Sequence, residues 1–198
     1  MNKNEILVVS GFGRCGTSLV MQMLYDGGMP VYYDKVGSFE TDKSTQLPRN
    51  DKWLEDCKGK AVKILDLHRF VPTPRFDYRF IWLSRRPRDQ AASTVKFWKA
   101  TGNRFNKKDH ELKTHLRVSY TRDIATCLDV IRGLANKRLP LMMQFEDIIA
   151  NPLSSAGKLS NFIENTLDID KMAKAVLPRK PECLDYMMED QIMEKYKE

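Results

Sequence analysis

The sequence predicts an α/β fold of three layers, in which helices flank a mostly parallel central sheet. Short, continuously apolar runs alternate with stretches of helical periodicity. Continuous apolar runs are typical of parallel strands that are covered on both faces, and their alternation with helices is typical of layered α/β folds. The 198 residues, with 42% hydrophobic and 30% charged side chains, suit one globular domain over residues 1–198.

Five runs are predicted to be strands, and five stretches are predicted to be helices. The strands are residues 5–10, 31–33, 61–67, 79–84 and 139–145. The helices are residues 17–25, 87–100, 109–136, 153–165 and 168–176, the second with Pro87 in its first turn. A short helix also follows the last strand, before Pro152. Residues 34–52 read as a long polar loop, which favours a substrate-binding loop or lid. Residues 182–198 read as a peripheral helix or tail.

Composition narrows the function classes. No apolar run approaches the roughly 20 residues that span a bilayer, and no signal-peptide core follows Met1, so we expect a cytoplasmic protein without membrane attachment. The net charge of +7 implies an anionic partner. No nucleic-acid module motif appears, so nucleic acid is not the expected partner. Four scattered cysteines and three histidines have neither disulfide nor metal-ligand spacing, which predicts reduced thiols and no metal site.

The stretch from Gly11 to Ser18 is a Gly-rich turn between a buried strand and a helix. Such a turn directs backbone N–H groups and the positive end of the helix dipole at an anion. Gly11, Gly16 and Ser18 match the phosphate-loop pattern G-x-x-x-x-G-K-[ST], but Thr17 stands at the lysine position and Arg14 is the cation of the loop. The layered fold is therefore expected to be P-loop NTPase-like.

A second segment places Arg85 at the end of a strand and Ser93 on the helix that follows. A guanidinium and a hydroxyl on facing elements can hold one phosphate between them. The alternative is an exposed surface on which Arg85, Arg86 and Arg88 pair with Asp89. In a third segment, residues 145–152, Glu146 or Asp147 is expected to cap a short helix.

Together these segments resemble the sulfotransferase family. The residues Gly13, Arg14, Cys15, Gly16, Thr17 and Ser18 are similar to its 5′-phosphosulfate loop. Arg85 and Ser93 match its 3′-phosphate motif, residues 145–152 its E-D-L-x-x-x-P segment, and residues 37–40 a G-x-x-E element of short members. The resemblance implies 3′-phosphoadenosine 5′-phosphosulfate (PAPS) as sulfuryl donor, 3′,5′-adenosine bisphosphate (PAP) as product and no required metal. It also implies a small-molecule or glycan acceptor.

The resemblance also implies catalytic roles. Arg14 stands at the loop-lysine position of the family and is expected to meet the charge of the leaving group. Lys63 either adds to that charge or is a surface lysine at a strand edge. Glu40 and His68 are the candidate bases, since family branches carry a glutamate or a histidine nearby; Glu40 is favoured, and His68 is otherwise a hydrogen-bonded histidine at a strand end.

Some residues depart from the family pattern. Arg179 and Lys180 stand where larger members have a glycine-rich loop over the adenosine phosphate. Cys15 is expected to be a tolerated small side chain and not a nucleophile. Asp66 is the one acid that could close a magnesium site at a strand end.

Aromatic residues fall into two groups. Tyr32, Tyr33, Phe39 and Trp53 either line an acceptor site or pack in the core, and Phe97, Trp98 and Phe105 are expected in the core. Two other functions stay open: a P-loop nucleoside or small-molecule kinase, and a nucleotide-binding module without turnover.

Overall fold

The computed structural model describes residues 2–34, 38–103, 105–136, 138–164 and 166–177. In this part of the chain, five parallel strands form one sheet in the order β2-β3-β1-β4-β5. The strands are β1 (Glu5–Gly11), β2 (Val31–Tyr32), β3 (Ala61–Lys63), β4 (Asp77–Ser84) and β5 (Leu141–Gln144). The parallel sheet expected from the continuous apolar runs is confirmed.

The central strand β1 positions the site. It pairs with β3 on one side (Leu7 opposite Ala61) and with β4 on the other (Val9 opposite Ile81). The strands β2 and β3, which follow β1 in the chain, lie on one side of it, and β4 and β5 lie on the other side. Ligands of open α/β sheets bind outside the carboxyl ends of the strands at such a switch point.

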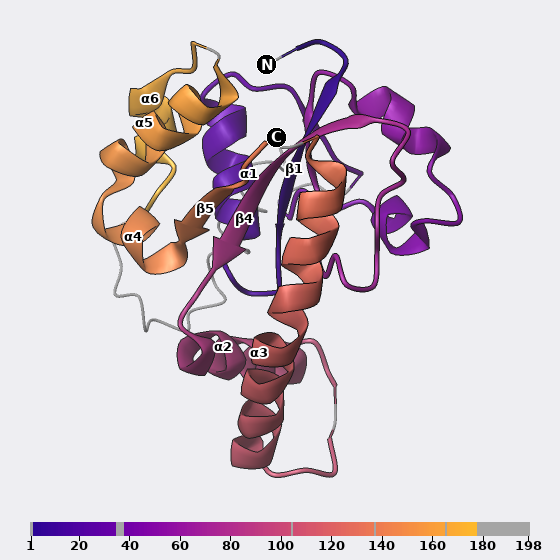
Figure 1. The fold of residues 1–198 in the computed structure, drawn as a ribbon. Helices are drawn as coiled ribbons and strands as arrows, with labels where there is room; N and C mark the ends of the chain where they lie inside the picture. Colours follow the sequence, from indigo (N-terminus) through magenta and orange to yellow (C-terminus); the bar gives the residue numbers. More distant parts are fainter. Residues whose placement is uncertain (1, 35–37, 104, 137, 165, 178–198) are drawn as a thin grey trace.

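Two layers cover the sheet (Figure 1). Leu7 and Val9 pack with α1 (Thr17–Asp26), α5 (Pro152–Ile163) and α6 (Ile169–Lys174). Ile6 and Val8 point the other way, into a core shared with the second half of α3 (Asp109–Leu134) and with the 3-10 helix η2 (Lys52–Cys57). The alternation along β1 thus feeds two cores, as a strand buried on both faces requires.

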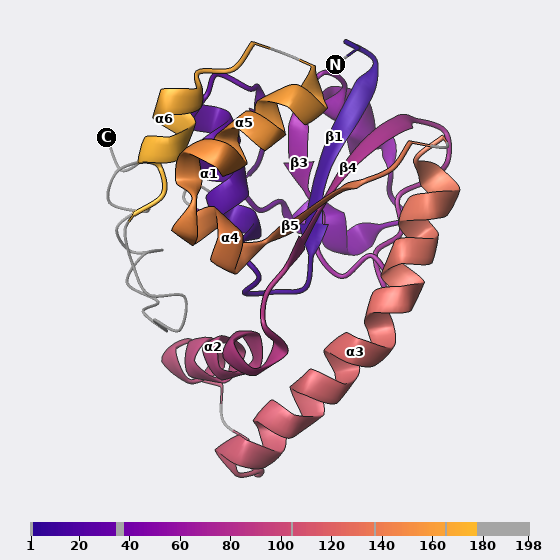
Figure 2. The same cartoon turned by 60° about the vertical axis from the view of Figure 1, so that its left-hand side comes forward.

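Two helices leave this body. α2 (Pro87–Ala100) follows β4 directly, and α2 with the first half of α3 projects beyond the carboxyl ends of the strands (Figures 1 and 2). The remaining elements are the short α4 (Phe145–Ala150) and the 3-10 helix η1 (Asp42–Gln46), which lies within the stretch expected to be an irregular loop.

Several predicted bounds were wrong. The strand expected over residues 61–67 ends at Lys63. The chain turns away at Asp66, which adopts a left-handed φ of 53° and whose carbonyl accepts a hydrogen bond from the Arg69 amide at 2.7 Å. The helix expected to reach residue 136 ends at Leu134, ahead of the left-handed Asn136. The expected tail, residues 182–198, lies outside the described residues. In the described part, no helix is long and apolar enough to cross a membrane.

Candidate functional site

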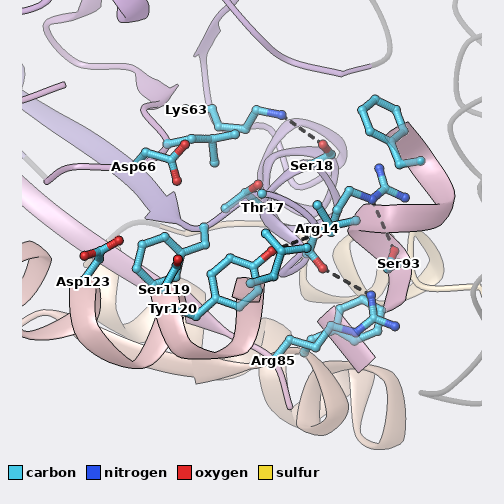
Figure 3. Close-up of a pocket in the computed structure, with 18 of the residues that line it drawn as sticks. Arg14, Thr17, Ser18, Lys63, Asp66, Arg85, Ser93, Ser119, Tyr120 and Asp123 are labelled. Carbon is cyan, nitrogen blue, oxygen red and sulfur yellow. Dashed lines mark hydrogen bonds between the residues drawn. The ribbon is translucent and has the colours of Figure 1, made fainter. Parts of the chain in front are cut away.

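A cavity of about 400 Å³ opens at the carboxyl edge of the sheet. Its walls come from the loop after β1, the ends of β3 and β4, and the sides of α2 and α3. Figure 3 shows Arg85 and Ser93 at one end and Asp66 and Asp123 at the other, with the Gly-rich loop between them. The structure therefore brings residues from the Gly-rich loop, from the segment with Arg85 and Ser93, and from the start of residues 145–152 to one site.

The loop needs glycine at residue 16. Gly16 has a φ of +101°, and a Cβ there would lie 2.6 Å from Cδ2 of Phe145. Gly16 is also the N-cap of α1, and it lines the cavity with Thr17 and Ser18. The first-turn N–H groups of α1 thus face the cavity, which is the arrangement that holds phosphate and sulfate groups.

Lys63 brings a cation to the loop from β3. Its side chain is only 2% exposed, so the surface-lysine interpretation is wrong. The ammonium donates to Ser18 Oγ at 3.0 Å and to the Ser38 carbonyl at 2.6 Å, and it pairs with Glu40 Oε1 at 2.9 Å. Phosphate loops carry their own lysine at the position that Thr17 occupies here. In this chain the lysine comes from β3 instead, and its ammonium contacts the hydroxyl of the next residue, Ser18.

Arg14 connects the loop with the second segment. Its Nε donates to Ser93 Oγ at 3.3 Å, and its carbonyl accepts from Arg85 Nη1 at 3.2 Å (Figure 3). The Arg14 guanidinium also lies 4.9 Å from the centre of the Phe97 ring. Ser93 and Arg85, which were expected to hold one phosphate together, are thus connected through their contacts with Arg14. Arg14 lies between the two candidate anion sites.

Arg85 is buried at 8% exposure and lies over the Phe145 ring at 4.5 Å. Burial lowers the pKa of Arg85, and the nearby Glu146 carboxylate opposes that effect. The exposed-surface interpretation is therefore wrong for Arg85, although Arg86 and Arg88 are exposed. The buried guanidinium lines the cavity, where an anionic ligand would offset its desolvation.

Glu146 does not cap α4, contrary to expectation. The N-cap of that helix is Gln144, without a side-chain hydrogen bond, so Asp147 does not cap it either. Glu146 Oε1 instead accepts from the Arg86 amide at 3.0 Å. This contact fixes the turn that carries Arg85 to the start of α2.

The other end of the cavity is polar, and the sequence analysis missed the part of it that comes from α3. Asp66, Ser119, Tyr120 and Asp123 line it, the last three from α3. Burial raises the pKa of Asp66. Tyr120 stacks on Phe12 with ring centres 5.3 Å apart, and it shares a 3.0 Å hydrogen bond with Thr94. The helix expected over residues 109–136 includes Tyr120, but only the position of α3 shows that this residue reaches the cavity.

His68 also lines the cavity, but both ring nitrogens lie near other groups. Nδ1 is 3.6 Å from Cys127 Sγ, and Nε2 is 3.8 Å from Asp123 Oδ2. Glu40 lines the cavity on the side of Lys63 with 45% of its side chain exposed. The geometry therefore leaves the Glu40 carboxylate more accessible to a ligand than the His68 ring.

The aromatic expectations divide. Phe97 and Trp98 line the cavity, so their assignment to the core was wrong. Phe105, 39% exposed, packs on Trp98 with ring centres 5.1 Å apart and is not a core residue either. Phe39 and Trp53 are buried in the two cores, as the packing alternative expected. Neither they nor the two neighbouring tyrosines, Tyr32 and Tyr33, are among the described residues that line the cavity.

Cys15 lies in the loop but is fully buried, and burial raises the pKa of its thiol to about 12. A thiol with this pKa is a poor nucleophile at neutral pH. Gly37, Arg179 and Lys180 lie outside the described residues. Within the described ranges, no group of three or more His, Cys, Asp or Glu side chains could hold a metal ion.

Comparison with known proteins gives a family match. The model of the sulfotransferase domain family matches residues 4–198. The fold is similar to that of mouse sulfotransferase SULT7A1 complexed with PAP, with a TM-score of 0.64 and 13% sequence identity. That similarity covers 89% of this chain and 64% of the mouse protein, so the chain spans less than two thirds of its length.

Two further structures share the fold. Retinol dehydratase in complex with androsterone and inactive cofactor PAP has a TM-score of 0.59 at 14% identity, covering 100% of this chain and 70% of that protein. The sulfotransferase domain of the Synechococcus PCC 7002 olefin synthase has a TM-score of 0.53 at 14% identity, covering 97% and 88%. No curated protein sequence matches the chain.

Proposed function

The chain belongs to the sulfotransferase domain family, and from that premise we propose that it transfers a sulfuryl group from PAPS to a hydroxyl or amine acceptor. One observation carries the proposal. Two groups of residues suited to anions, the α1 N-terminus with Lys63 and the buried Arg85 with Ser93, lie in one cavity and are connected by Arg14. A donor with separate 5′ and 3′ anionic groups needs two such arrangements.

The residues present fit PAPS. The Gly16 position leaves no room for a side chain, and the first turn of α1 offers N–H groups to a 5′-phosphosulfate. Arg85 offers a planar guanidinium to a 3′-phosphate, and Ser93 offers a hydroxyl. When bound, PAPS supplies the sulfuryl group and a phosphate leaving group, and PAP is the product.

Positive charge is needed where the leaving phosphate becomes more negative. We assign this role to Lys63 and Arg14. The Lys63 ammonium lies 3.0 Å from Ser18 Oγ, within the cradle, and 2.6 Å from the Ser38 carbonyl. Arg14 occupies the middle of the loop and lines the cavity. Together they replace the lysine that the loop lacks at Thr17.

We assign Glu40 as the base. The attacking hydroxyl must lose its proton as its oxygen bonds to sulfur, and a carboxylate at hydrogen-bond reach can accept it. Glu40 Oε1 forms an ion pair with the Lys63 ammonium at 2.9 Å. Protonation of Glu40 would weaken that ion pair and leave more of the Lys63 charge to the cradle. His68 is the second candidate, with Cys127 and Asp123 already beside its ring nitrogens.

The kinase alternative is not favoured. The family match is to sulfotransferases, and a phosphate-loop kinase uses a loop lysine and magnesium held by an acidic strand end. Here Thr17 stands at the lysine position. Asp66, the acid that could have served magnesium, lies with His68 and Asp123 at the end of the cavity away from Arg85 and Ser93.

Transfer is tested by measuring PAP release from PAPS with a panel of hydroxyl and amine acceptors. The wild type is expected to release PAP faster with an acceptor than with water alone. Glu40→Gln is expected to bind PAP as the wild type does and to lose about 10²–10⁴-fold in acceptor-dependent turnover, the usual contribution of a general base. His68→Asn is expected to retain turnover. Loss with His68→Asn and retention with Glu40→Gln would exchange the two roles.

A further inference from the structure

Most of the net charge of the molecule resides in one projecting segment. Residues 87–123, which comprise α2, the first half of α3 and the loop between them, are called the basic arm here. They contain 9 of the 33 lysines and arginines and 4 of the 26 acidic residues. The basic arm therefore carries a formal charge of +5, out of +7 for the whole chain. A charge that is concentrated in this way marks the arm as the place where an anionic partner is attracted.

Most basic side chains of the arm lie at its surface. Seven of those that the structure describes are exposed, among them Arg88, Lys107 and Arg117. Three of the four acidic groups of the arm already have partners. Asp109 pairs with Lys99, and this ion pair lowers the pKa of Asp109. Glu111 accepts from the Lys108 amide, and Asp123 pairs with Arg122.

The basic arm is continuous with the cavity. The cavity wall from which the arm extends is lined by Ser93 and Phe97 of α2 and by Leu116 and Tyr120 of α3. Figure 3 shows Ser93 and Tyr120 there. An acceptor that is small enough to fit within about 400 Å³ would leave the outer arm unused. A long acceptor with one unit in the cavity would lie with its neighbouring units along the arm.

The cavity end beneath the arm has groups that suit a sugar. Asp66 and Ser119 offer polar atoms to hydroxyl groups, and the stacked Phe12 and Tyr120 rings offer apolar faces. A polysaccharide also carries hydroxyl groups, the atoms to be sulfurylated, on every unit. An acidic protein or a nucleic acid provides the negative charge, but fewer hydroxyl groups per unit.

We propose that the basic arm is the docking surface for an acidic polysaccharide whose hydroxyl groups accept the sulfuryl group. This inference rests on the proposed function, because it names the acceptor class for the same cavity. Charged side chains of the arm would bind the carboxylate or sulfate groups of the polymer, and the hydroxyl face of one sugar would meet Asp66 and Asp123. Binding by dispersed surface charges is expected to weaken steeply with salt.

The variant that tests the arm is Lys113→Glu/Arg117→Glu. These two residues lie four apart on α3, on one side of the helix, and neither lines the cavity. The matched control is Lys158→Glu/Lys174→Glu, which makes the same charge change at exposed positions on α5 and α6. Thermal melts and PAP affinity show whether each variant is folded.

Binding of fluorescently labelled alginate and chondroitin is measured by anisotropy over a salt series, without PAPS. Both are expected to bind the wild type, and uncharged dextran is not. The arm variant is expected to bind at least about tenfold more weakly, with a salt slope reduced by about 2, because two cationic contacts are lost. The control variant should bind as the wild type does. Equal binding by the arm variant, or equal binding of dextran, would overturn the proposal.

Competition and transfer complete the test. Polyglutamate and single-stranded RNA are expected to compete poorly, and either of them competing as well as alginate would assign the arm to that class of partner. Radiolabelled PAPS is expected to label chondroitin, and the arm variant should raise KM for chondroitin at unchanged kcat. Binding without labelling would overturn the acceptor assignment. Failure of PAP to bind any variant would instead contradict the proposed function, and it is measured separately.

Discussion

The ammonium of Lys63 lies 3.0 Å from the hydroxyl of Ser18. Lys63 ends β3 and Ser18 is the second residue of α1, so the contact joins a strand to the first turn of the helix that follows its neighbouring strand. A phosphate loop with threonine in place of lysine thus keeps a lysine charge in its cradle. The relationship explains how this loop can serve an anionic donor without the cation of its own consensus.

Replacing Lys63 with methionine tests that explanation. Lys63→Met keeps most of the side-chain volume and removes the charge that is proposed to meet the leaving phosphate. Turnover is expected to fall about 10²–10³-fold, the usual cost of losing one group that stabilises developing charge. Lys58→Met is the matched control, because Lys58 forms an exposed ion pair with Glu55. Steady-state PAP release measures both, and equal rates for Lys63→Met and the wild type would refute the assigned role.

Removing Arg85 tests the 3′-phosphate site. Arg85→Ala is expected to raise the Kd for PAP by roughly 10–100-fold, since hydrogen bonds between charged groups contribute about 1.5–3 kcal/mol. Arg88→Ala, at an exposed position of α2, should bind PAP as the wild type does. Calorimetry measures both affinities. Unchanged binding by Arg85→Ala would remove the 3′-phosphate from this end of the cavity.

The shape of the cradle is tested at Gly16. A Cβ in Gly16→Ala would meet the Phe145 ring at 2.6 Å and would hold a left-handed φ of 101°. We expect the free energy of unfolding to fall by about 1–3 kcal/mol, the cost of such backbone strain, and PAP binding to be lost. Gly133→Ala is the control, because nothing lies within 4 Å of its Cβ and alanine favours the helix. Urea unfolding distinguishes them, and a Gly16→Ala variant as stable as the wild type would contradict the packing.

Asp66 is expected to make stability depend on pH. Burial raises the pKa of Asp66, so the folded protein holds this proton more tightly than the unfolded chain does. Its contribution to stability is therefore full at pH values below the unfolded pKa of about 3.9 and is lost as pH rises through the higher folded pKa. Asp66→Asn removes this loss.

Thermal melts at acid and neutral pH measure that effect. The gain in Tm of Asp66→Asn over the wild type should be larger at neutral pH than at pH values near the unfolded pKa. Asp129→Asn, at an exposed position of α3, should show no such difference. A gain for Asp66→Asn that is the same at both pH values would show that burial does not penalise the charged form.

The sequence predicted the elements that have local causes. The apolar run of β1, the glycines of the loop and Pro87 at the start of α2 each depend on neighbours within a few residues, and the predicted helix over residues 87–100 has the bounds of α2. Arg85 could be placed at a strand end for the same reason. Local patterns therefore located most of the fold and both segments proposed to bind anions.

The contacts of the site depend on the order of the strands. The role of Lys63 was left open between a catalytic charge and a surface lysine. Its burial could not be predicted, because it follows from β3 pairing with β1 and from the hydrogen bond of its ammonium to the Ser38 carbonyl. Ser119, Tyr120 and Asp123 went unnoticed because a helical pattern shows which residues share a face and not what that face meets. The left-handed φ of Asp66, which lies in the second half of the run predicted as a strand, was indicated by no residue pattern.

Binding of PAP, compared with that of magnesium–ATP, tests the central claim most directly. At 100 times its Kd, PAP should stabilise the folded protein by about 2.7 kcal/mol, which raises the Tm of a chain of this size by several degrees. Magnesium–ATP at the same concentration should shift it less. A melt that responds to magnesium–ATP and not to PAP would contradict the assignment of this cavity to a phosphosulfate donor.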